Sequence, residues 1–353
     1  MKSFCVQLIS LSVIFSINAQ NLENDQRLKK ALERYPEADK NKDGILTVEE
    51  AMAFRREIKS VKKKKISPPN TDISLFTKKI LNLKYGEHDR NVIDLWLVKS
   101  DKPTPLMIYI HGGGFKGGDK SKGYKHIEGF LEKGISFASI NYRFMPDSGI
   151  GVRGSLNDSK RALQFLRYKA SEFNLDKTKF GCMGDSAGAG TTFWLAFTDD
   201  MANPLSKDPV ERESTRITVA AGFGAQCTYN IQRWKEVMDV VGEGDESDLL
   251  AFYGFKSIEE MNTEKGQKVI ANLDMLGLLT KDDPPFYVMN TQPGGIVDIK
   301  NKGHLYHHAN HAKALKERAL EVGVEHLCFA SKIGIQDSPD SNVVNFALKH
   351  FNH

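Results

Sequence analysis

The sequence contains little cysteine, with four residues in a chain of 353, and the first of them lies in an apolar N-terminal stretch. The remaining three, Cys182, Cys227 and Cys328, are an odd number. An odd number argues against a disulfide framework and favours buried thiols, with one disulfide as the alternative. A strong charge excess is also missing, because the net charge is only +4. This mild charge does not indicate nucleic-acid binding, and the sequence contains no basic helix interleaved with aromatic residues.

Long apolar runs are missing as well. The apolar stretch 4–17 follows Lys2 and is too short for a comfortable membrane span. A basic start, a short apolar core and the small residue Ala19 before a polar one are typical of a secretory signal peptide at residues 1–19. We therefore expect a secreted or periplasmic protein with no membrane span in its mature form, and an uncleaved anchor is the alternative.

Oxygen-bearing side chains recur in residues 39–50, between helical patterns at 28–38 and 49–58. Their spacing resembles the 12-residue calcium loop of an EF-hand, with Gly44 at the sharp turn in position six. The expected Ca²⁺ ligands are Asp39, Asn41, Asp43, the backbone carbonyl of Ile45, Thr47 and Glu50. A single unpaired loop predicts weak binding, with a Kd of about 10⁻⁴–10⁻³ M. We interpret it as a structural site or as a docking site for a calcium-dependent protein partner, rather than as a catalytic switch.

Strand-like segments alternate with helical patterns in the rest of the chain. The predicted strands are 81–85, 92–98, 106–110, 136–141, 180–183, 217–223, 285–291 and 324–330. This alternation predicts an α/β fold with a mostly parallel central sheet and helices on both faces. Residues 229–280 form a long insertion with amphipathic runs at 246–253 and 258–276. The insertion fits either a lid or pocket wall, or ordinary packing helices.

Two glycine-rich motifs each follow a predicted strand. Residues 111–115 read His-Gly-Gly-Gly-Phe, and residues 184–188 read Gly-Asp-Ser-Ala-Gly before a helical run at 191–198. A serine on a sharp strand-to-helix turn needs small neighbours, which is typical of a nucleophile elbow. The glycines of the first motif let backbone N–H groups face a developing oxyanion. Together, and in this order, the two motifs predict a serine hydrolase.

These residues resemble the α/β-hydrolase superfamily, in particular its HGGG-type carboxylesterase and hormone-sensitive-lipase-like branch. The resemblance runs from about residue 81 to the C-terminus, and it includes the pairs Tyr142-Arg143 and Asn157-Asp158. It implies that Ser186 is the nucleophile. It also implies an oxyanion hole formed by the backbone N–H groups of Gly113, Gly114 and Ala187. His111 is interpreted as a structural residue that shapes the glycine turn.

The resemblance further implies an acid after the seventh strand and a histidine after the eighth. However, the loop 331–338 after the eighth strand contains no histidine, and the loop 292–298 has no acid at the usual early position. Four histidines follow instead, at positions His304, His307, His308 and His311. They fit a displaced base, a metal cluster or a solvated helix start; His307 and His311 would suit a metal if both lie on one helix. We take His308 and His307 as candidate bases and Asp298 as the candidate acid.

The sequence therefore predicts a signal peptide at 1–19, an EF-hand module at 20–60, a linker at 61–72 and an α/β-hydrolase domain at 73–353. The predicted activity is hydrolysis of short-acyl carboxylic esters, on a small molecule or on a polysaccharide, with no cofactor for catalysis. The alternative is a catalytically degenerate hydrolase that acts as a calcium-dependent binding protein. The fold alone does not choose between them, because it supports many functions.

Overall fold

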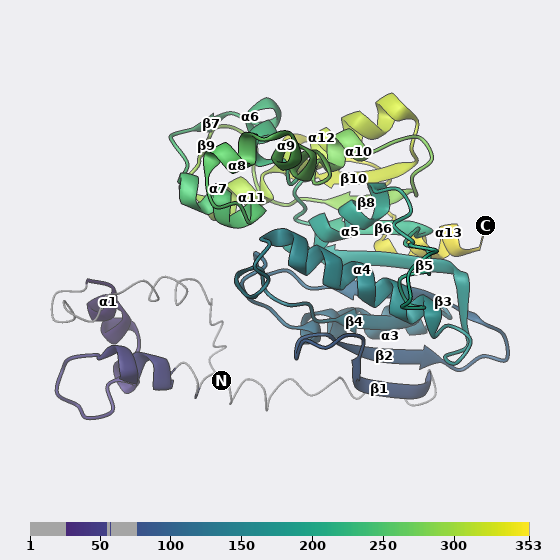
Figure 1. Cartoon of the computed structure of the whole chain (residues 1–353), viewed down its shortest axis with the longest axis horizontal. Coiled ribbons are helices and arrows are strands. Elements are labelled where there is room, and N and C mark those ends of the chain that lie inside the picture. The colour runs from purple at the N-terminus through teal and green to yellow at the C-terminus, as the bar shows by residue number, and fades with distance from the viewer. Residues whose placement is uncertain (1–25, 55–56, 58–75, 353) are drawn as a thin grey trace. The chain divides into compact units, whose positions relative to one another are not determined.

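The computed structural model describes residues 26–54, 57 and 76–352 (Figure 1). The chain divides into two compact units, Met1–Pro68 and Pro69–His353. The predicted signal peptide at 1–19 and the predicted linker at 61–72 lie outside the described residues.

The first unit is a helix–loop–helix. It contains α1 (Gln26–Arg34), the short 3₁₀ helix η2 (Pro36–Ala38) and a second α-helix described over residues 48–54. The two helices and the intervening loop bury a small core made of Leu28, Ala38, Leu46, Ala51 and Phe54. This core includes the apolar Leu46 inside the predicted calcium loop, so the loop is packed against both helices.

The second unit is built on a nine-stranded sheet with the order β1-β2-β4-β3-β5-β6-β8-β10-β11. The strands are β1 (Phe76–Lys84), β2 (Val92–Val98), β3 (Thr104–Ile110), β4 (Ser136–Ile140), β5 (Leu175–Asp185), β6 (Val219–Phe223), β8 (Phe286–Met289), β10 (His326–Ala330) and β11 (Ile335–Gln336). The six strands that are adjacent in the sheet as β4-β3-β5-β6-β8-β10 run parallel, whereas β1, β2 and β11 pair antiparallel at the two edges. The predicted mostly parallel sheet is confirmed.

Helices cover both faces of the sheet (Figure 1). On one face, α3 (Ile127–Leu131) and α13 (Val343–Phe351) pack on alternate strand residues such as Tyr109 and Met183. The other face is covered by α4 (Val152–Tyr168), α5 (Ala187–Phe197) and α12 (Ala309–Val322). These helices pack on the intervening strand residues, such as Ile108 and Cys182. Strands buried on both faces read as continuous apolar runs, which is why these segments could be recognised in the sequence.

The remaining elements are short. They are η4 (Lys120–His126), η5 (Met145–Asp147), η6 (Ile231–Arg233), α6 (Trp234–Val237), β7 (Val240–Val241), α7 (Glu246–Tyr253), α8 (Ile258–Asn262), α9 (Glu264–Ala271), α10 (Met275–Leu278), β9 (Val297–Asp298), α11 (Lys302–His307) and η7 (Ser331–Ile333). The predicted run at 258–276 is three helices rather than one, because Thr263 ends α8 and caps α9 with its side chain, and a turn separates α9 from α10. Strand β7 of the insertion pairs with β9 in a small separate sheet.

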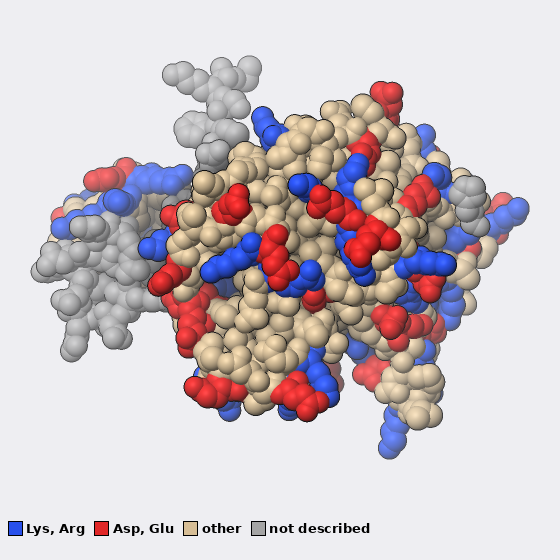
Figure 2. Space-filling model, turned by 90° about the horizontal axis from the view of Figure 1, so that it is seen from above, with Lys and Arg blue, Asp and Glu red and all other residues tan. Residues whose placement is uncertain are grey.

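The described part of the chain has mixed charges on the face in Figure 2 and no long apolar helix. Figure 2 shows basic and acidic side chains interspersed over one face, with no region of a single sign. Within the described part of the chain, no helix is both long and apolar enough to cross a membrane. All three described cysteines, Cys182, Cys227 and Cys328, are free and buried, as the odd count indicates.

Candidate functional site

Ser186 sits on the sharp turn between β5 and α5, at the centre of the parallel sheet. Its backbone has φ 53° and ψ −121°, a conformation that is rare and strained for a residue with a side chain. The turn is held in place because the Ser186 N–H donates to the carbonyl of Phe223 at the end of β6, at 2.7 Å. The strained turn lifts the hydroxyl above the carboxyl edge of the sheet, where parallel α/β folds bind their ligands.

An imidazole meets this hydroxyl. His307 Nε2 lies 2.8 Å from Ser186 Oγ, although 121 residues separate them in sequence. The other ring nitrogen, Nδ1, lies 2.9 Å from the carbonyl oxygen of Gly303, one turn earlier on α11. A carbonyl only accepts, so Nδ1 carries the proton and Nε2 is left free to accept the Ser186 hydroxyl proton. The hydrogen bonds therefore select the tautomer that a general base requires.

No carboxylate completes this arrangement among the described residues. The candidate acid Asp298 is exposed on β9, and its carboxylate accepts from the backbone N–H of Lys300 instead. The position after the seventh sheet strand in the chain, where the resemblance implies an acid, is occupied by Asn290 directly after β8. The structure thus gives the imidazole a backbone partner, Gly303 O, and no hydrogen bond to Asp298.

The other histidines of the cluster have separate positions. His308 is fully buried; its Nδ1 accepts from the Asn310 N–H at the start of α12, and its Nε2 faces Gly295 O at 2.9 Å. The candidate base His308 is therefore a helix cap and has no hydrogen bond to Ser186. The metal hypothesis for His307 and His311 requires one continuous helix, but the chain turns at His308 and divides α11 from α12.

Burial keeps these imidazoles neutral. Burial lowers the pKa of His307 below its ordinary value, against a smaller raising effect of its bond to the Gly303 carbonyl. Burial likewise lowers the pKa of His311 to about 3. His311 is enclosed between Cys227 and Leu305, with Nδ1 3.2 Å from the Cys227 sulfur and Nε2 3.0 Å from the Leu305 carbonyl. It is part of the packing around α11 and not an exposed ligand.

The glycine-rich loop 111–115 lies against the elbow. Gly112 comes so close that a Cβ there would stand 2.4 Å from the backbone carbonyl of Asp185, which only glycine avoids. Gly113 and Gly114 are exposed at this edge, so their N–H groups are accessible to a ligand. Ala187 is the first residue of α5, and its N–H has no acceptor within the helix. The loop and the helix start are therefore the candidate donors of an oxyanion hole next to Ser186.

His111 supports this loop from below. It is fully buried and stacks on Tyr142 with ring centroids 4.4 Å apart. The Arg90 guanidinium lies 3.2 Å from its Nε2 and also donates to the carbonyls of Tyr142 and Gly118. Burial lowers the pKa of His111 to about 3, so the ring is a neutral structural group. This placement agrees with the structural interpretation of His111.

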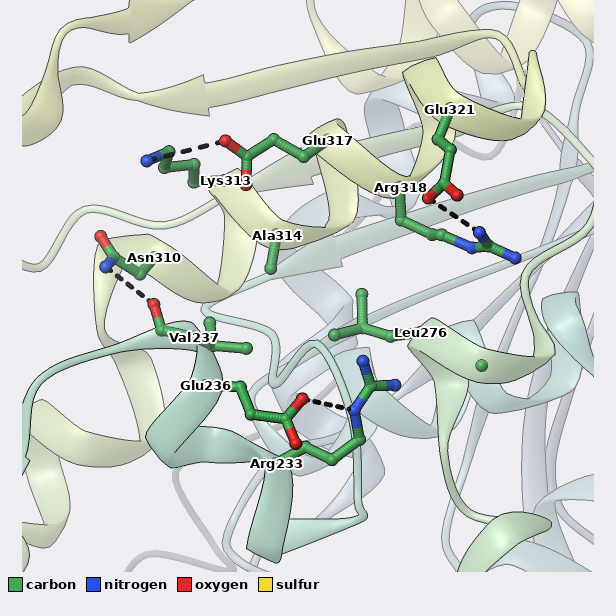
Figure 3. Close-up of a pocket in the computed structure, with 11 residues that line it drawn as sticks. Arg233, Glu236, Val237, Leu276, Asn310, Lys313, Ala314, Glu317, Arg318 and Glu321 are labelled. Atoms are coloured by element: carbon green, nitrogen blue, oxygen red, sulfur yellow. Dashed lines mark hydrogen bonds and ion pairs between the residues drawn. The ribbon is translucent and has the colours of Figure 1, made fainter.

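A separate pocket of about 600 Å³ lies between α6, α10 and α12 (Figure 3). It has an apolar base of Val237, Leu276 and Ala314, surrounded by charged side chains. Those charges are paired within the protein, Arg233 with Glu236 and Arg318 with Glu321. Neither Ser186 nor His307 lines this pocket, so it is separate from the serine–histidine pair.

The predicted calcium loop is folded around its own carboxylates. Asp39 accepts from the N–H groups of Lys42 and Gly44, at 2.7 and 2.9 Å. Glu50 reaches back to the N–H groups of Lys40 and Asn41, and its second oxygen accepts from Thr47. Thr47 and Glu50 together form a capping box at the start of the second helix. Glu50, at the last ligand position, is thereby tied to the second and third positions of the loop, Lys40 and Asn41.

The donor set of this loop fits a hard cation. Carboxylate, amide and hydroxyl oxygens are the ligands that Ca²⁺ prefers. Gly44 at φ +83° makes the sharp turn expected at position six. In the described conformation, however, no three His, Cys, Asp or Glu side chains gather closely enough among the described residues to form a metal cluster. The carboxylates of Asp39, Asp43 and Glu50 accept from backbone N–H groups of the loop.

Some neighbours of the serine–histidine pair had no signal in the sequence. Gly303 acts through its backbone carbonyl, and a carbonyl has no residue signature. Gly224 lies under the imidazole, where a Cβ would stand 3.2 Å from His307 Cδ2. Its φ of +61° could be guessed only from the turn that follows β6. These contacts depend on how α11 packs on the sheet.

Comparison with known proteins supports the fold and gives the family. The family described as BD-FAE matches residues 93–308, which is more than half of the chain and includes both Ser186 and His307. A probable isoprenylcysteine alpha-carbonyl methylesterase from Oryza sativa is 26% identical over 71% of this chain and 63% of its own length. The probable carboxylic ester hydrolase LipM of Mycobacterium tuberculosis is 24% identical over 62% of this chain and 49% of its own. The chain thus spans less than two thirds of these relatives.

Two solved structures have the same fold. A truncated carbohydrate esterase from gut microbiota aligns with a TM-score of 0.60 and 15% identity, over 80% of this chain and 99% of its own. An acetyl ester-xyloside bifunctional hydrolase from Caldicellulosiruptor lactoaceticus aligns with a TM-score of 0.54 and 19% identity, over 79% and 95%. With its parallel sheet, its Gly-Asp-Ser-Ala-Gly elbow and the matched region 93–308, the chain has the α/β-hydrolase fold and belongs to the BD-FAE family.

Proposed function

We propose that the protein is a carboxylic ester hydrolase in which Ser186 is the nucleophile and His307 the general base. The observation that carries the proposal is the 2.8 Å contact between Ser186 Oγ and His307 Nε2 on a strained elbow. A serine hydroxyl is a weak nucleophile until a base takes its proton, and this contact supplies the base. The names of the relatives, which are esterases, agree with this reaction class.

The proposed reaction proceeds through an acyl-enzyme. Ser186 Oγ attacks the ester carbonyl as its proton passes to His307 Nε2, and the N–H groups of Gly113, Gly114 and Ala187 stabilise the oxyanion. The imidazolium then gives the proton to the departing alkoxide, which leaves as the alcohol. Water attacks the acyl-enzyme in the same way, releasing the acid and restoring Ser186. Throughout, the Gly303 carbonyl accepts from Nδ1–H and disperses part of the imidazolium charge.

The proposed substrates are esters of short acyl groups, including acyl groups on polysaccharide. Gly113 and Gly114 are exposed, and an open oxyanion loop can accept an ester carried on a bulky alcohol. Of two solved proteins with the same fold, one is named a carbohydrate esterase and the other an acetyl ester-xyloside bifunctional hydrolase. Release of acetate from acetylated xylan tests this choice, and no release alongside hydrolysis of a small ester would restrict the substrates to small molecules.

Hydrolysis of a short p-nitrophenyl ester tests the activity itself. We expect Ser186→Ala and His307→Gln each to reduce kcat by about 10³-fold or more, because each removes one half of a unit. His304→Gln is the matched control, since it lies one turn earlier on α11 and contacts the Pro293 carbonyl instead. Equal activity in wild type and Ser186→Ala would reject the proposal in favour of a binding protein.

We further propose that the loop 39–50 binds Ca²⁺, through Asp39, Asn41, Asp43, Ile45 O, Thr47 and Glu50, and that the protein is exported. The oxygen donor set and the capped helix after it support calcium binding. Export follows from the predicted signal peptide at 1–19, which lies outside the described residues. Calorimetric titration should give a Kd of about 10⁻⁴–10⁻³ M that Glu50→Gln weakens. No heat of binding in wild type at millimolar Ca²⁺ would refute the site.

A further inference from the structure

The segment that carries the imidazole is held by its backbone carbonyls. Helix α11 has six residues and ends at His307, so its last carbonyls have no partner within the helix. Four successive carbonyls, from Leu305 to His308, accept instead from side chains of other elements. The contacts are His311 Nε2 to Leu305 O at 3.0 Å, Gln226 Nε2 to Tyr306 O at 2.6 Å, Asn290 Nδ2 to His307 O at 3.4 Å and Asn290 Nδ2 to His308 O at 3.1 Å.

The two amide side chains in this set come from segments that follow two neighbouring strands of the sheet. Gln226 follows β6, and Asn290 directly follows the neighbouring parallel strand β8. Both are buried, with 6% and 1% of their surface exposed. Asn290 is anchored further, because its backbone N–H donates to Phe329 O of β10 at 2.9 Å. Donors fixed to adjacent central strands can hold a short helix at one position above the sheet.

We propose that Gln226 and Asn290 are positioning residues for His307, and that this amide clamp takes over part of the role of the missing carboxylate. The inference rests on the proposed function, in which His307 is the base. Gly303 O orients the imidazole ring, but it lies on the same short helix and moves with it. The clamp is what ties that helix to the strands that carry Ser186 and its neighbours. A shift of the base by about 1 Å is enough to reduce catalysis strongly.

The first test is Gln226→Met, which keeps the length of the side chain and removes the donor. We expect kcat for the p-nitrophenyl ester to fall by about 10- to 100-fold, with KM changed by less than about threefold, because the base moves while the oxyanion hole does not. Asn290→Leu is expected to act in the same direction. A loss confined to Gln226→Met would remove Asn290 from the clamp.

The second test is Gln226→Glu, which a purely structural role would not explain. A glutamate facing the Tyr306 carbonyl can donate only when it is protonated, and burial raises its pKa above the ordinary value of about 4.3. We expect its kcat, relative to wild type, to rise by about tenfold as the pH falls from about 8 to about 5.5. This readout remains decisive if Gln226→Met does not fold.

Gln164 provides a matched control. It is also a buried glutamine, 1% exposed, whose Nε2 donates to two backbone carbonyls, those of Glu211 and Glu213. Gln164→Met should therefore leave kcat unchanged, even if it lowers the free energy of unfolding. The clamp is refuted if Gln226→Met retains kcat within twofold, if the ratio for Gln226→Glu is flat with pH, or if Gln164→Met loses as much. If Ser186→Ala were instead as active as the wild type, the proposed function itself would be refuted.

Discussion

At the scale of single residues, the imidazole of His307 combines two hydrogen bonds with partial burial. The bond from Nδ1–H to Gly303 O fixes the tautomer, which is the part of an acid's work that geometry alone can do. A neutral carbonyl stabilises an imidazolium less than a carboxylate would. Burial also disfavours the imidazolium, and it lowers the pKa of His307. As the proposed base, His307 is therefore correctly oriented but less basic than the histidine of a complete triad.

This lowered pKa predicts the acid limb of the activity profile. An imidazolium cannot accept the Ser186 proton, so activity is lost as the pH falls through the pKa of His307. Because that pKa is lowered by burial, the midpoint of the acid limb in kcat/KM should lie below the ordinary value of about 6.5. A pH series with the p-nitrophenyl ester measures it, and a midpoint above 6.5 would contradict the assignment.

Lys122 offers a second prediction at this scale. Its Nζ donates to the Gly112 carbonyl at 3.2 Å, and this carbonyl belongs to the same peptide group as the Gly113 N–H. A cation on the carbonyl oxygen polarises the peptide and strengthens that N–H as a donor to the oxyanion. We expect Lys122→Met to lower kcat by about 2- to 10-fold with little change in KM. Lys125→Met is the control, because Lys125 lies beside the Asp185 carboxylate at 3.5 Å; an equal loss there would reject the idea.

At the scale of elements, the break between α11 and α12 decides the site. His308 leaves the helical conformation with ψ 139°, ends α11 and caps α12 by accepting from the Asn310 N–H. The break turns two neighbouring histidines to different tasks: His307 faces Ser186, while His308 is buried behind it. Had the helix continued, His307 and His311 would lie on one face, as the metal hypothesis assumed.

The contribution of the His308 cap to the free energy of unfolding can be measured. We expect His308→Ala to lower the free energy of unfolding by about 1 kcal/mol, the usual loss on removing a helix cap. The same change should lower kcat, since the cap adjoins the base. Urea denaturation gives the first quantity, and His304→Ala serves as the comparison on α11. A His308→Ala protein as stable as wild type would show that the cap contributes nothing.

At the scale of the whole molecule, several imidazoles are buried in neutral form, and this makes the fold sensitive to acid. Burial, assisted by the neighbouring charge of Lys125, lowers the pKa of His126 to about 4, and burial lowers that of His111 to about 3. Below an unfolded-state pKa of about 6.5 the unfolded chain binds protons that the folded chain excludes. Stability is therefore full above that pH and falls progressively as the pH drops toward about 4.

His126→Phe tests this quantitatively. The ring of His126 lies between Tyr109 and Phe223, so a phenyl ring suits the position, and its Nε2 has no hydrogen-bond partner among the described residues. Between pH 7 and pH 5 the wild type should lose roughly 1–2 kcal/mol more of unfolding free energy than the variant. Denaturation at the two pH values measures the difference, and identical losses would refute the titration of His126.

Local patterns were sufficient to predict much of this protein. The continuous apolar runs predicted the central strands, because strands buried on both faces must be apolar throughout. The glycines of residues 111–115 and 184–188 predicted an oxyanion loop and an elbow, because sharp turns and close backbone approaches admit few other residues. The fold class and the position of Ser186 at a strand end therefore follow from the amino-acid sequence by itself.

The partner of Ser186 does not follow in this way. Four histidines lie within residues 304–311, and which of them faces a serine 121 residues away depends on where α11 ends and on how Gln226 and Asn290 hold it. Asp298 looked suitable by its place in the chain, yet on β9 it is exposed, and the hydrogen bond of its carboxylate is with the Lys300 N–H instead of the imidazole. Turn propensities and strand patterns are local properties, whereas the contact between Ser186 and His307 is set by packing between distant segments. That choice belongs to the tertiary structure.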